Sequence, residues 1–358
     1  MSSPSSSSPA ALQWLARLAV VLSLLCAVGL AGLYHFGPAR SGWAELLRYV
    51  PFLLYTAPAA LALLLSLALG WWWRLGALLA LALMATAVMD LRLGLGRTDL
   101  PPDAPGTRTV RFMTYNIKSY RAVFKAGGFV PLNNEIEQHQ PDILVMQDAR
   151  EVSRVGDLPY GMRAVLPKHK LYAYGQYAVA SRFPISGCAP FDMSLKDEKS
   201  DYVRCTVDID GTRIDLVTAH LLTPREGLNA TREERLGGLD DWSGNFADRL
   251  SQAERITAAL TPLKRPTIVA GDLNAPEHSV VVGRFLDLGL RDAFSAGGIG
   301  WGFTHGHSFK PGVSFLRIDH ILVSPDIGVR DAWVGWRGGS EHRPVVADLV
   351  IPTRAAKP

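Results

Sequence analysis

The first hundred residues contain two uncharged apolar stretches that are long enough to cross a lipid bilayer as helices. Residues 18–39 and 49–73 are runs of 22 and 25 residues without Asp, Glu, Lys or Arg. A helix of about 20 apolar residues spans the hydrocarbon of a bilayer. A third uncharged run, residues 75–89, has only 15 residues, and Arg74 and Asp90 would have to reach toward the interfaces to lengthen it.

We therefore expect residues 1–97 to form a membrane region with two or three transmembrane helices, at about residues 12–34, 49–73 and 75–92. The chain would then be a multi-pass protein of the cell membrane. The alternative for the first run is a cleaved secretory signal, although the residues before it are rich in Ser and Pro rather than basic. The flanking arginines, counted literally, place the rest of the chain in the cytoplasm, but they are few, and the side stays open.

Charged residues, Gly and Pro return to the levels of a soluble protein after residue 97. Residues 98–109, TDLPPDAPGTRT, indicate a linker, and residues 110–358 form the predicted soluble domain. Two helical stretches, Asn133–His139 and Asn245–Leu263, interrupt its apolar runs. The runs are typical of strands: VRFMTYNI, DILVMQDA, YAVASRFPI, VRCTVDID, RIDLVTAHL, TIVAGDLN, IDHILVS and PVVADLVI. Many strands with few helices predict an α/β sandwich of sheets covered by helices.

Nearly every predicted strand ends in polar residues that can take part in metal or phosphate chemistry. Functional residues of layered α/β folds gather at strand ends, whereas a single polar strand end is explained by turn formation. The series is too long to be explained by turns alone: Asn116, Gln147, Asp148, His220, Asp272, Asn274, Asp319, Glu341 and His342.

The carboxylates and amides of this series form a set of hard oxygen ligands that suits Mg²⁺ or Mn²⁺. Asn116, Asp148 and Glu341 are the candidate metal ligands. Such an ion polarises a phosphoryl oxygen and stabilises charge during phosphoester hydrolysis. In GDLN, Asp272 and Asn274 stand two residues apart, so in an extended segment both side chains would face the same way and hold one water. Asp272 would take the proton of that water.

His220 and His342 supply imidazoles for acid–base work or for contact with phosphate. Asp319 is a natural partner for one of them, because an Asp–His pair holds the ring in one tautomer and favours its charged form. The remaining histidines of this domain are expected to be ordinary exposed or core side chains: His169, His278, His305 and His307.

The motifs together resemble the endonuclease/exonuclease/phosphatase superfamily, which includes DNase I-like nucleases, abasic-site endonucleases, sphingomyelinases and inositol-polyphosphate phosphatases. The resemblance covers about residues 110–351 and rests on TYNI, PDILVMQD, SRFPI, TAHL, GDLN, RIDHILVS and SEHRPV in that order. It implies a four-layered α/β sandwich with the site at one edge of two central sheets.

The resemblance also implies a role for each matching residue. Asn116 takes the asparagine position near metal and phosphate, and Asp148 takes the acidic metal-ligand position. The remaining matches are His220 as the contact to the scissile phosphate, Asp272 and Asn274 as the pair that positions or activates water, Asp319 as the carboxylate that orients His342, and Glu341 as the acid before that histidine.

Two departures from the family pattern fall at metal positions. The family usually has Gln-Glu where this chain has Gln147-Asp148, and Ser-Asp-His where it has Ser340-Glu341-His342. Asp148 is one methylene shorter than the usual glutamate, and Glu341 is one methylene longer than the usual aspartate. If both acids reach the same ion, a small displacement of the ion compensates for the two changes in length. The alternative is drift in a catalytically weakened domain that serves as a membrane-bound binder of phosphate ligands.

The predicted activity is metal-dependent hydrolysis of a phosphodiester or a phosphomonoester. The sequence leaves the substrate open between nucleic acid, a phospholipid head group and an inositol phosphate. The formal net charge of +4 fits an anionic partner, and no protein partner is expected. Basic loop residues would favour nucleic acid: Arg121, Lys125, Arg163, Lys168 and Lys170. Membrane tethering would favour a lipid. Cys188 and Cys205 are either a disulfide of an oxidising compartment or two small buried side chains.

Overall fold

The computed structural model describes residues 9–36, 41–50, 53–99, 104–155, 157–195, 199–234, 237–306 and 313–353. The chain divides into two compact units, Met1–Leu91 and Arg92–Pro358, and each is treated by itself.

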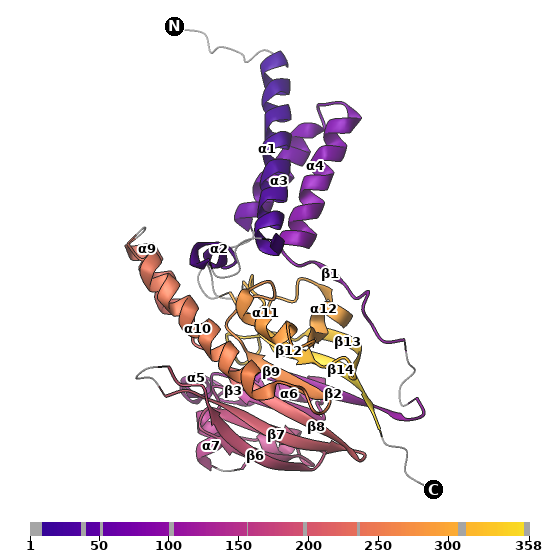
Figure 1. Cartoon of the computed structure of the whole chain (residues 1–358), viewed down its shortest axis with the longest axis vertical. Helices are drawn as coiled ribbons and strands as arrows, with labels where there is room; N and C mark the ends of the chain where they lie inside the picture. The colour runs from indigo at the N-terminus through magenta and orange to yellow at the C-terminus, as the bar shows by residue number, and fades with distance from the viewer. Residues whose placement is uncertain are drawn as a thin grey trace. The chain divides into compact units, whose positions relative to one another are not determined.

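The first unit is helical (Figure 1). Its elements are α1 (Pro9–Phe36), α2 (Gly42–Leu47), α3 (Leu53–Ser66), α4 (Trp71–Leu83) and a π-helical turn η1 (Met84–Val88). Helix α1 and the stretch Trp71–Val88 are long and apolar enough to cross a membrane, whereas the apolar helix Leu54–Ser66 is shorter. The bounds differ from the expected run 49–73 because the chain leaves the helical conformation at Gly70, the N-cap of α4.

The second unit is built on two six-stranded mixed sheets, one with the order β10-β12-β9-β8-β7-β6 and the other with the order β13-β14-β2-β3-β5-β4. The central pairs β8–β9 and β2–β3 are parallel. The strands are β2 (Thr107–Asn116), β3 (Ile143–Gln147), β4 (Lys170–Tyr174), β5 (Tyr177–Ser181), β6 (Ile185–Asp192), β7 (Asp201–Ile209), β8 (Thr212–His220), β9 (Thr267–Asp272), β10 (Arg291–Asp292), β12 (Asp319–Val323), β13 (Gly328–Val334) and β14 (Val345–Pro352).

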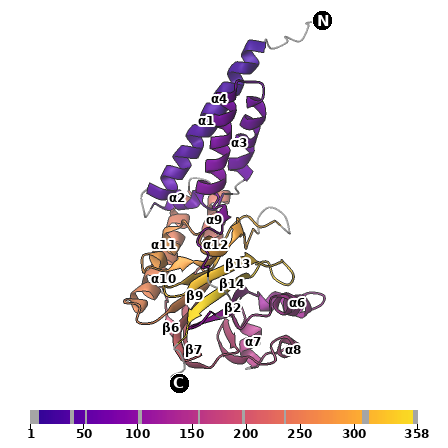
Figure 2. The same ribbon diagram turned by 90° about the vertical axis from the view of Figure 1, so that its right-hand side faces the viewer.

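Helices cover the outer face of each sheet, so the unit has four layers (Figure 2). The inner faces bury a shared core of aliphatic and aromatic side chains such as Phe112, Val179 and Ile268. The helices are α5 (Ser119–Phe124), α6 (Val130–His139), α7 (Arg150–Val155), α8 (Met162–Val165), α9 (Arg225–Glu233), α10 (Leu239–Leu260), α11 (Val280–Leu286) and α12 (Ala293–Gly297). The fold is the predicted α/β sandwich of the DNase I-like type.

Each of the eight predicted runs contains a strand, but YAVASRFPI is divided between β5, which ends at Ser181, and β6, which begins at Ile185 in the other sheet. Both predicted helices form with earlier starts, as α6 and α10. The sequence did not reveal β4 or β13, whose burial patterns show partial exposure on both faces. Their apolar residues therefore lack the continuous run of the central strands, which are buried throughout. These two strands form because they pair with neighbouring strands of the sheet, β4 with β5 and β13 with β14.

Residues 92–98, at the start of the second unit, pack on its body. Strand β1 (Arg92–Leu93) pairs with β11 (Ile299–Gly300), and Arg92 forms an ion pair with Glu277 at 2.8 Å. Thr98 donates its backbone N–H to Val329 and accepts from Val329 through its hydroxyl. Residues 92–98 are therefore held by the second unit, whereas the N-terminal region was expected to extend to residue 97 and the linker to begin at residue 98.

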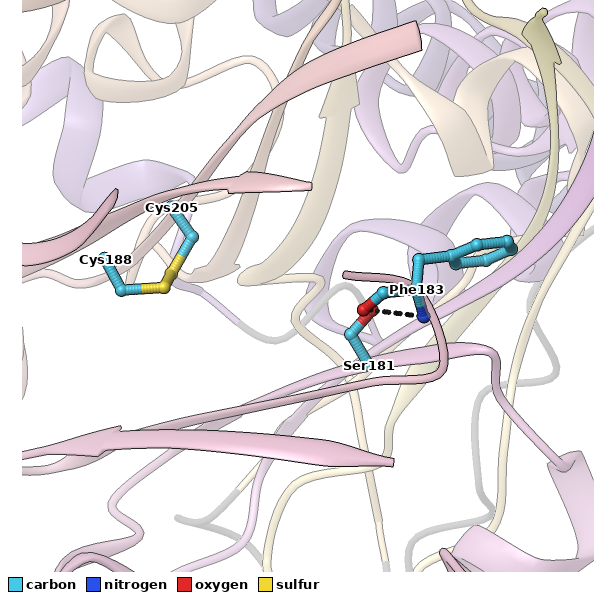
Figure 3. Close-up of a disulfide and its surroundings, with 4 residues drawn as sticks. All are labelled: Ser181, Phe183, Cys188 and Cys205. Atoms are coloured by element: carbon cyan, nitrogen blue, oxygen red, sulfur yellow. Dashed lines mark hydrogen bonds between the residues drawn. A yellow bond between two sulfur atoms is a disulfide. The ribbon is translucent and has the colours of Figure 1, made fainter. Parts of the chain in front are cut away.

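A disulfide joins Cys188 on β6 to Cys205 on β7 (Figure 3). The two strands pair antiparallel with a register shift between Ser186 and Ala189, which brings Cys188 beside Cys205. Of the two possibilities left open by the sequence, the bonded form is the one present. Cys26 is the free cysteine.

Candidate active site

Strand register places three of the predicted residues side by side at one edge of the first sheet. His220, the last residue of β8, lies opposite Asp272, the last residue of β9. Asp272 in turn lies opposite Asp319, the first residue of β12. Residues separated by about 50 positions in the sequence thus meet because their strands are neighbours.

The second sheet supplies the facing side of the site through β2 and β3, whose ends Asn116 and Gln147 are paired in register. The Asn116 side-chain amide donates to Asp272 Oδ2 at 2.9 Å, which joins the two sheets. Gln147 points the other way and donates to the hydroxyls of Thr114 and Thr218 inside the sandwich. Gln147 is thus structural, while Asp148, the next residue, reaches the site.

His342 arrives from the loop before β14 and donates from Nδ1 to Asp319 Oδ2 at 2.9 Å. Ser340 fixes this loop, because its hydroxyl donates to the Asn116 carbonyl and accepts from the His342 backbone N–H. Burial of the ring lowers the pKa of His342, but attraction by Asp319 and Asp272 outweighs it and leaves the pKa above its ordinary value. The pair is the Asp–His arrangement expected from the sequence.

Asp272 lies at the centre of the site. Its Oδ2 is 3.5 Å from His220 Nε2 and 3.6 Å from His342 Nε2. Its Oδ1 accepts the backbone N–H of Asn274. The expected extended geometry of GDLN is absent, because β9 ends at Asp272 and Asn274 has a φ of +49°. The Asn274 amide instead donates to the Leu221 carbonyl at 2.8 Å.

Two residues of α10 hold the loops that carry these groups. The buried guanidinium of Arg249 donates to the Asn274 carbonyl at 3.1 Å, and Gln252 Oε1 accepts the Leu222 N–H at 2.7 Å. Behind Asp319, Arg317 forms ion pairs with Asp292 and Glu277. Arg317 lies two residues before Asp319, so these ion pairs hold the segment that leads into β12.

The two substituted acids are each paired with a basic side chain of the segment that follows TYNI. Lys118 Nζ lies 2.8 Å from Asp148 Oδ2, and Arg121 forms an ion pair with Glu341. Burial would raise the pKa of Asp148, but His220 and Lys118 lower it below its ordinary value. Asp148 is therefore a carboxylate at neutral pH.

The donor set fits a hard divalent cation. It contains the Asp148 and Glu341 carboxylates and the Asn116 amide oxygen, and Glu341 Oε2 is a buried oxygen without a hydrogen-bond partner in the described part of the chain. Atoms of Asp272, Asp319 and His342 also lie within 4.8 Å of one another, close enough to hold an ion. The Asp319–His342 hydrogen bond leaves His342 Nε2 facing Asp272, 3.6 Å from its Oδ2, an arrangement that also suits acid–base work.

The site opens into a pocket of about 220 Å³. Of the predicted residues, Asp148, His220, Asp272, Asn274 and His342 line it, and the lining also includes Lys118, Thr223, Pro224, Arg225, Leu228, His305, Leu316 and Ile318. The predicted residues Asn116 and Asp319 are hydrogen-bonded to lining groups, to Asp272 and His342. Glu341 is not part of the lining and is paired with Arg121.

Sequence reasoning missed two polar residues of the pocket lining, Lys118 and His305, and one residue that contacts the lining, Gln176. His305 was expected to be ordinary, but its ring stacks on His342 with centroids 4.2 Å apart. Gln176 accepts from His220 Nδ1 at 2.8 Å, which turns Nε2 toward Asp272. Lys118 carried a signal, its position directly after TYNI. His305 and Gln176 carried none, because they come from loops remote in sequence.

The other histidines fit the ordinary role where they are described. His169 is buried and donates to the Pro141 carbonyl at 2.8 Å, and His278 is not part of the pocket lining. His307 lies outside the described residues. Among the basic loop residues, Arg163 forms an ion pair with Asp157 and donates to the His169 carbonyl, so it serves local structure.

A family model described as endonuclease/exonuclease/phosphatase family matches residues 113–342. A comparison with curated protein sequences gives no match. Similar solved structures include an endonuclease/exonuclease/phosphatase family protein from Bacteroides thetaiotaomicron, which is 17% identical, with 68% of this chain and 98% of that chain covered and a TM-score of 0.49. An AP endonuclease from Archaeoglobus fulgidus is 18% identical, with 66% and 98% covered and a TM-score of 0.48. A mannosyl-6-phosphatase from Bacteroides thetaiotaomicron is 16% identical, with 67% and 99% covered and a TM-score of 0.46.

Proposed function

Because the chain belongs to the endonuclease/exonuclease/phosphatase family, we propose that it is a divalent-metal-dependent phosphoesterase that hydrolyses a phosphodiester. The observation that carries this proposal is the convergence of His220, Asp272 and the Asp319–His342 pair on one pocket. The buried carboxylate can accept a proton from water, and the imidazoles on either side of it can donate hydrogen bonds to phosphate oxygens.

Each residue has a distinct task in this reaction. Asp272 accepts the proton of the attacking water, and Asn116 and the Asn274 backbone hold its carboxylate in place. His220 donates from Nε2 to a phosphate oxygen, with its ring oriented by Gln176. His342, whose cationic form is favoured by the neighbouring Asp319 carboxylate, stabilises the charge that develops on the phosphoryl group.

Family members usually use divalent metals, and the proposed cofactor is Mg²⁺ or Mn²⁺. Asp148, Glu341 and Asn116 would hold the ion, with the carboxylates neutralising its charge. When bound, the ion polarises a phosphoryl oxygen and stabilises negative charge in the transition state.

The proposed substrate is a phosphate ester within reach of a membrane, drawn from nucleic acids, phospholipid head groups and inositol phosphates. The pocket volume of about 220 Å³ fits one phosphate and a small part of its substituents, not a whole head group with its acyl chains. The rest of the substrate would therefore lie outside the pocket. No protein partner is proposed.

We further propose that the N-terminal helices anchor the protein in the cell membrane as a multi-pass protein and that the catalytic unit lies outside the cytoplasm. The Cys188–Cys205 disulfide supports the side, because such bonds persist in oxidising compartments. This outweighs the few arginines that favour the cytoplasm. A C-terminal fusion to alkaline phosphatase is expected to be active in cells. An inactive phosphatase fusion, together with a fluorescent C-terminal fusion to a reporter that fluoresces only in the cytoplasm, would refute the assignment.

The experiment that tests the proposed activity is hydrolysis of bis-p-nitrophenyl phosphate, plasmid DNA, sphingomyelin and an inositol polyphosphate by the full chain in detergent. Each substrate is combined with Mg²⁺, Mn²⁺ or EDTA. Metal-dependent turnover that is lost in His342→Ala and kept in His278→Ala is expected. Phosphate binding without turnover under any metal would favour the alternative function, a catalytically weakened binding module. The two substituted acids are the reason to test this alternative.

A further inference from the structure

Asp148 and Glu341, the two acids that depart from the family pattern, each pair with a basic side chain from the same short segment of the chain. Lys118 precedes α5 and reaches Asp148, and Arg121 within α5 reaches Glu341. The Lys118–Asp148 pair is the more enclosed, with side chains 12% and 19% exposed, against 38% and 29% for Arg121 and Glu341. The site thus carries internal cations at the carboxylates that would receive a metal ion.

The backbone around Lys118 is shaped to direct its side chain at Asp148. Lys118 and Asp148 both have positive φ, +44° and +50°, a conformation that is uncommon for residues with a side chain. Ser119 locks the two together, because its N–H and its hydroxyl both donate to the Asp148 carbonyl, at 2.8 and 2.7 Å. The Lys118 N–H also points at the Asn116 side-chain oxygen, 3.3 Å away.

The pair is ionised at neutral pH. An ammonium and a carboxylate are the ordinary forms of these side chains at neutral pH, and Lys118 Nζ lies 2.8 Å from Asp148 Oδ2. His220 is a second neighbour of this carboxylate, with its Nδ1 3.8 Å from Asp148 Oδ1. The ammonium therefore neutralises this carboxylate in the same way as a bound cation would.

We propose, resting on the proposed function, that Lys118 is an internal counterion that a divalent metal must displace from Asp148 and that then serves the phosphate of the substrate. Lys118 lines the same pocket as His220 and His342, so a displaced ammonium stays beside the place where a phosphate would bind. The ammonium then no longer pairs with Asp148 and pairs with the phosphate instead. Metal and phosphate therefore bind cooperatively, each stabilising the state that the other needs.

The test is titration of the full chain in detergent with Mn²⁺, with free Mn²⁺ followed by electron paramagnetic resonance, alone and with inorganic phosphate. Without phosphate, Lys118→Met is expected to bind Mn²⁺ about tenfold more tightly than the wild type, which corresponds to about 1.4 kcal/mol. Phosphate is expected to tighten Mn²⁺ binding in the wild type and to have a smaller effect in the variant. Lys125→Met, on the exposed end of the same segment, is the matched control and is expected to leave both constants unchanged.

Two further variants keep the test decisive. Lys118→Gln retains a polar side chain in case the Met variant does not fold, and it is expected to tighten Mn²⁺ binding in the same direction. Arg121→Met is expected to have a smaller effect, because the Arg121–Glu341 pair is more exposed and solvent screens it.

Equal or weaker Mn²⁺ binding in the folded Lys118 variants, with hydrolysis intact in the wild type, would overturn the counterion role and leave the proposed function standing. Absence of Mn²⁺ binding in every variant, together with absence of hydrolysis, would overturn the proposed function and this inference with it. Mn²⁺ bound only by the Lys118 variants would be the strongest support for the inference.

Discussion

Replacement of Asp319 by Asn tests the central Asp–His pair while conserving the shape of the side chain. Asp319 Oδ2 accepts from His342 Nδ1 at 2.9 Å, and both side chains are at least 97% buried. Asparagine can still present an oxygen to Nδ1, so the ring position can survive the change. What disappears is the negative charge that stabilises the imidazolium.

The size of the effect follows from the kind of bond that is lost. A hydrogen bond to a charged group contributes about 1.5–3 kcal/mol, against about 1 kcal/mol for a neutral one. If this difference of about 0.5–2 kcal/mol is expressed in the transition state, kcat in the Asp319→Asn variant falls by roughly 2- to 30-fold, at about 1.4 kcal/mol per factor of ten. The KM for a small diester changes little, because Asp319 is not part of the pocket lining.

The pH dependence gives a second readout of the same pair. The pKa of His342 is raised in the folded protein, despite its burial, by Asp319 and Asp272. A raised pKa stabilises the fold below the unfolded value, near 6.5, and this stabilisation is lost as pH rises through the folded value. The Asp319→Asn variant should therefore lose the most unfolding free energy at pH 6 or below and less at alkaline pH.

The activity is measured with bis-p-nitrophenyl phosphate and Mn²⁺ between pH 5.5 and 9.5, and stability by urea unfolding in EDTA. The alkaline limb of the rate profile should move to lower pH in the variant, since the imidazolium loses its partner. Asp331→Asn, a half-exposed carboxylate that pairs with Arg97, is the control. Unchanged kcat and an unchanged alkaline limb would refute the assignment of His342 as a charged group in the reaction.

Three other perturbations follow from the structure. A catalytic unit that begins at residue 105 should unfold at lower urea than one that begins at Arg92, because loss of the Arg92–Glu277 ion pair alone removes about 1.5–3 kcal/mol; coincident unfolding midpoints would contradict this. His305→Ala should lower kcat by roughly 2- to 10-fold, from the 0.5–1.5 kcal/mol of an aromatic pair, with rescue by His305→Phe, and an alanine variant at full rate would exclude the stacking role. Asp148→Glu and Glu341→Asp should be non-additive in Mn²⁺ affinity by more than about 0.5 kcal/mol, whereas additive effects would show that the two acids do not share an ion.

Much of the candidate site was predictable because its residues follow apolar strand runs. Asn116, His220 and Asp272 each end a strand that is buried throughout its last residues, so the polar residue after the run was visible without knowledge of the neighbours. His305 was not predictable, since its role depends on stacking with a ring 37 positions away. The same holds for Gln176, which acts only through its contact with His220.

The sequence by itself determined which segments become the central strands and which residues stand at their ends, because the alternation of apolar runs and polar ends is local along the chain. The tertiary structure alone decided how these ends combine. Register set Asp272 between His220 and Asp319, and the turn after TYNI set Lys118 on Asp148. Such pairings depend on strand order and backbone torsion angles, which bring together residues that the sequence keeps apart.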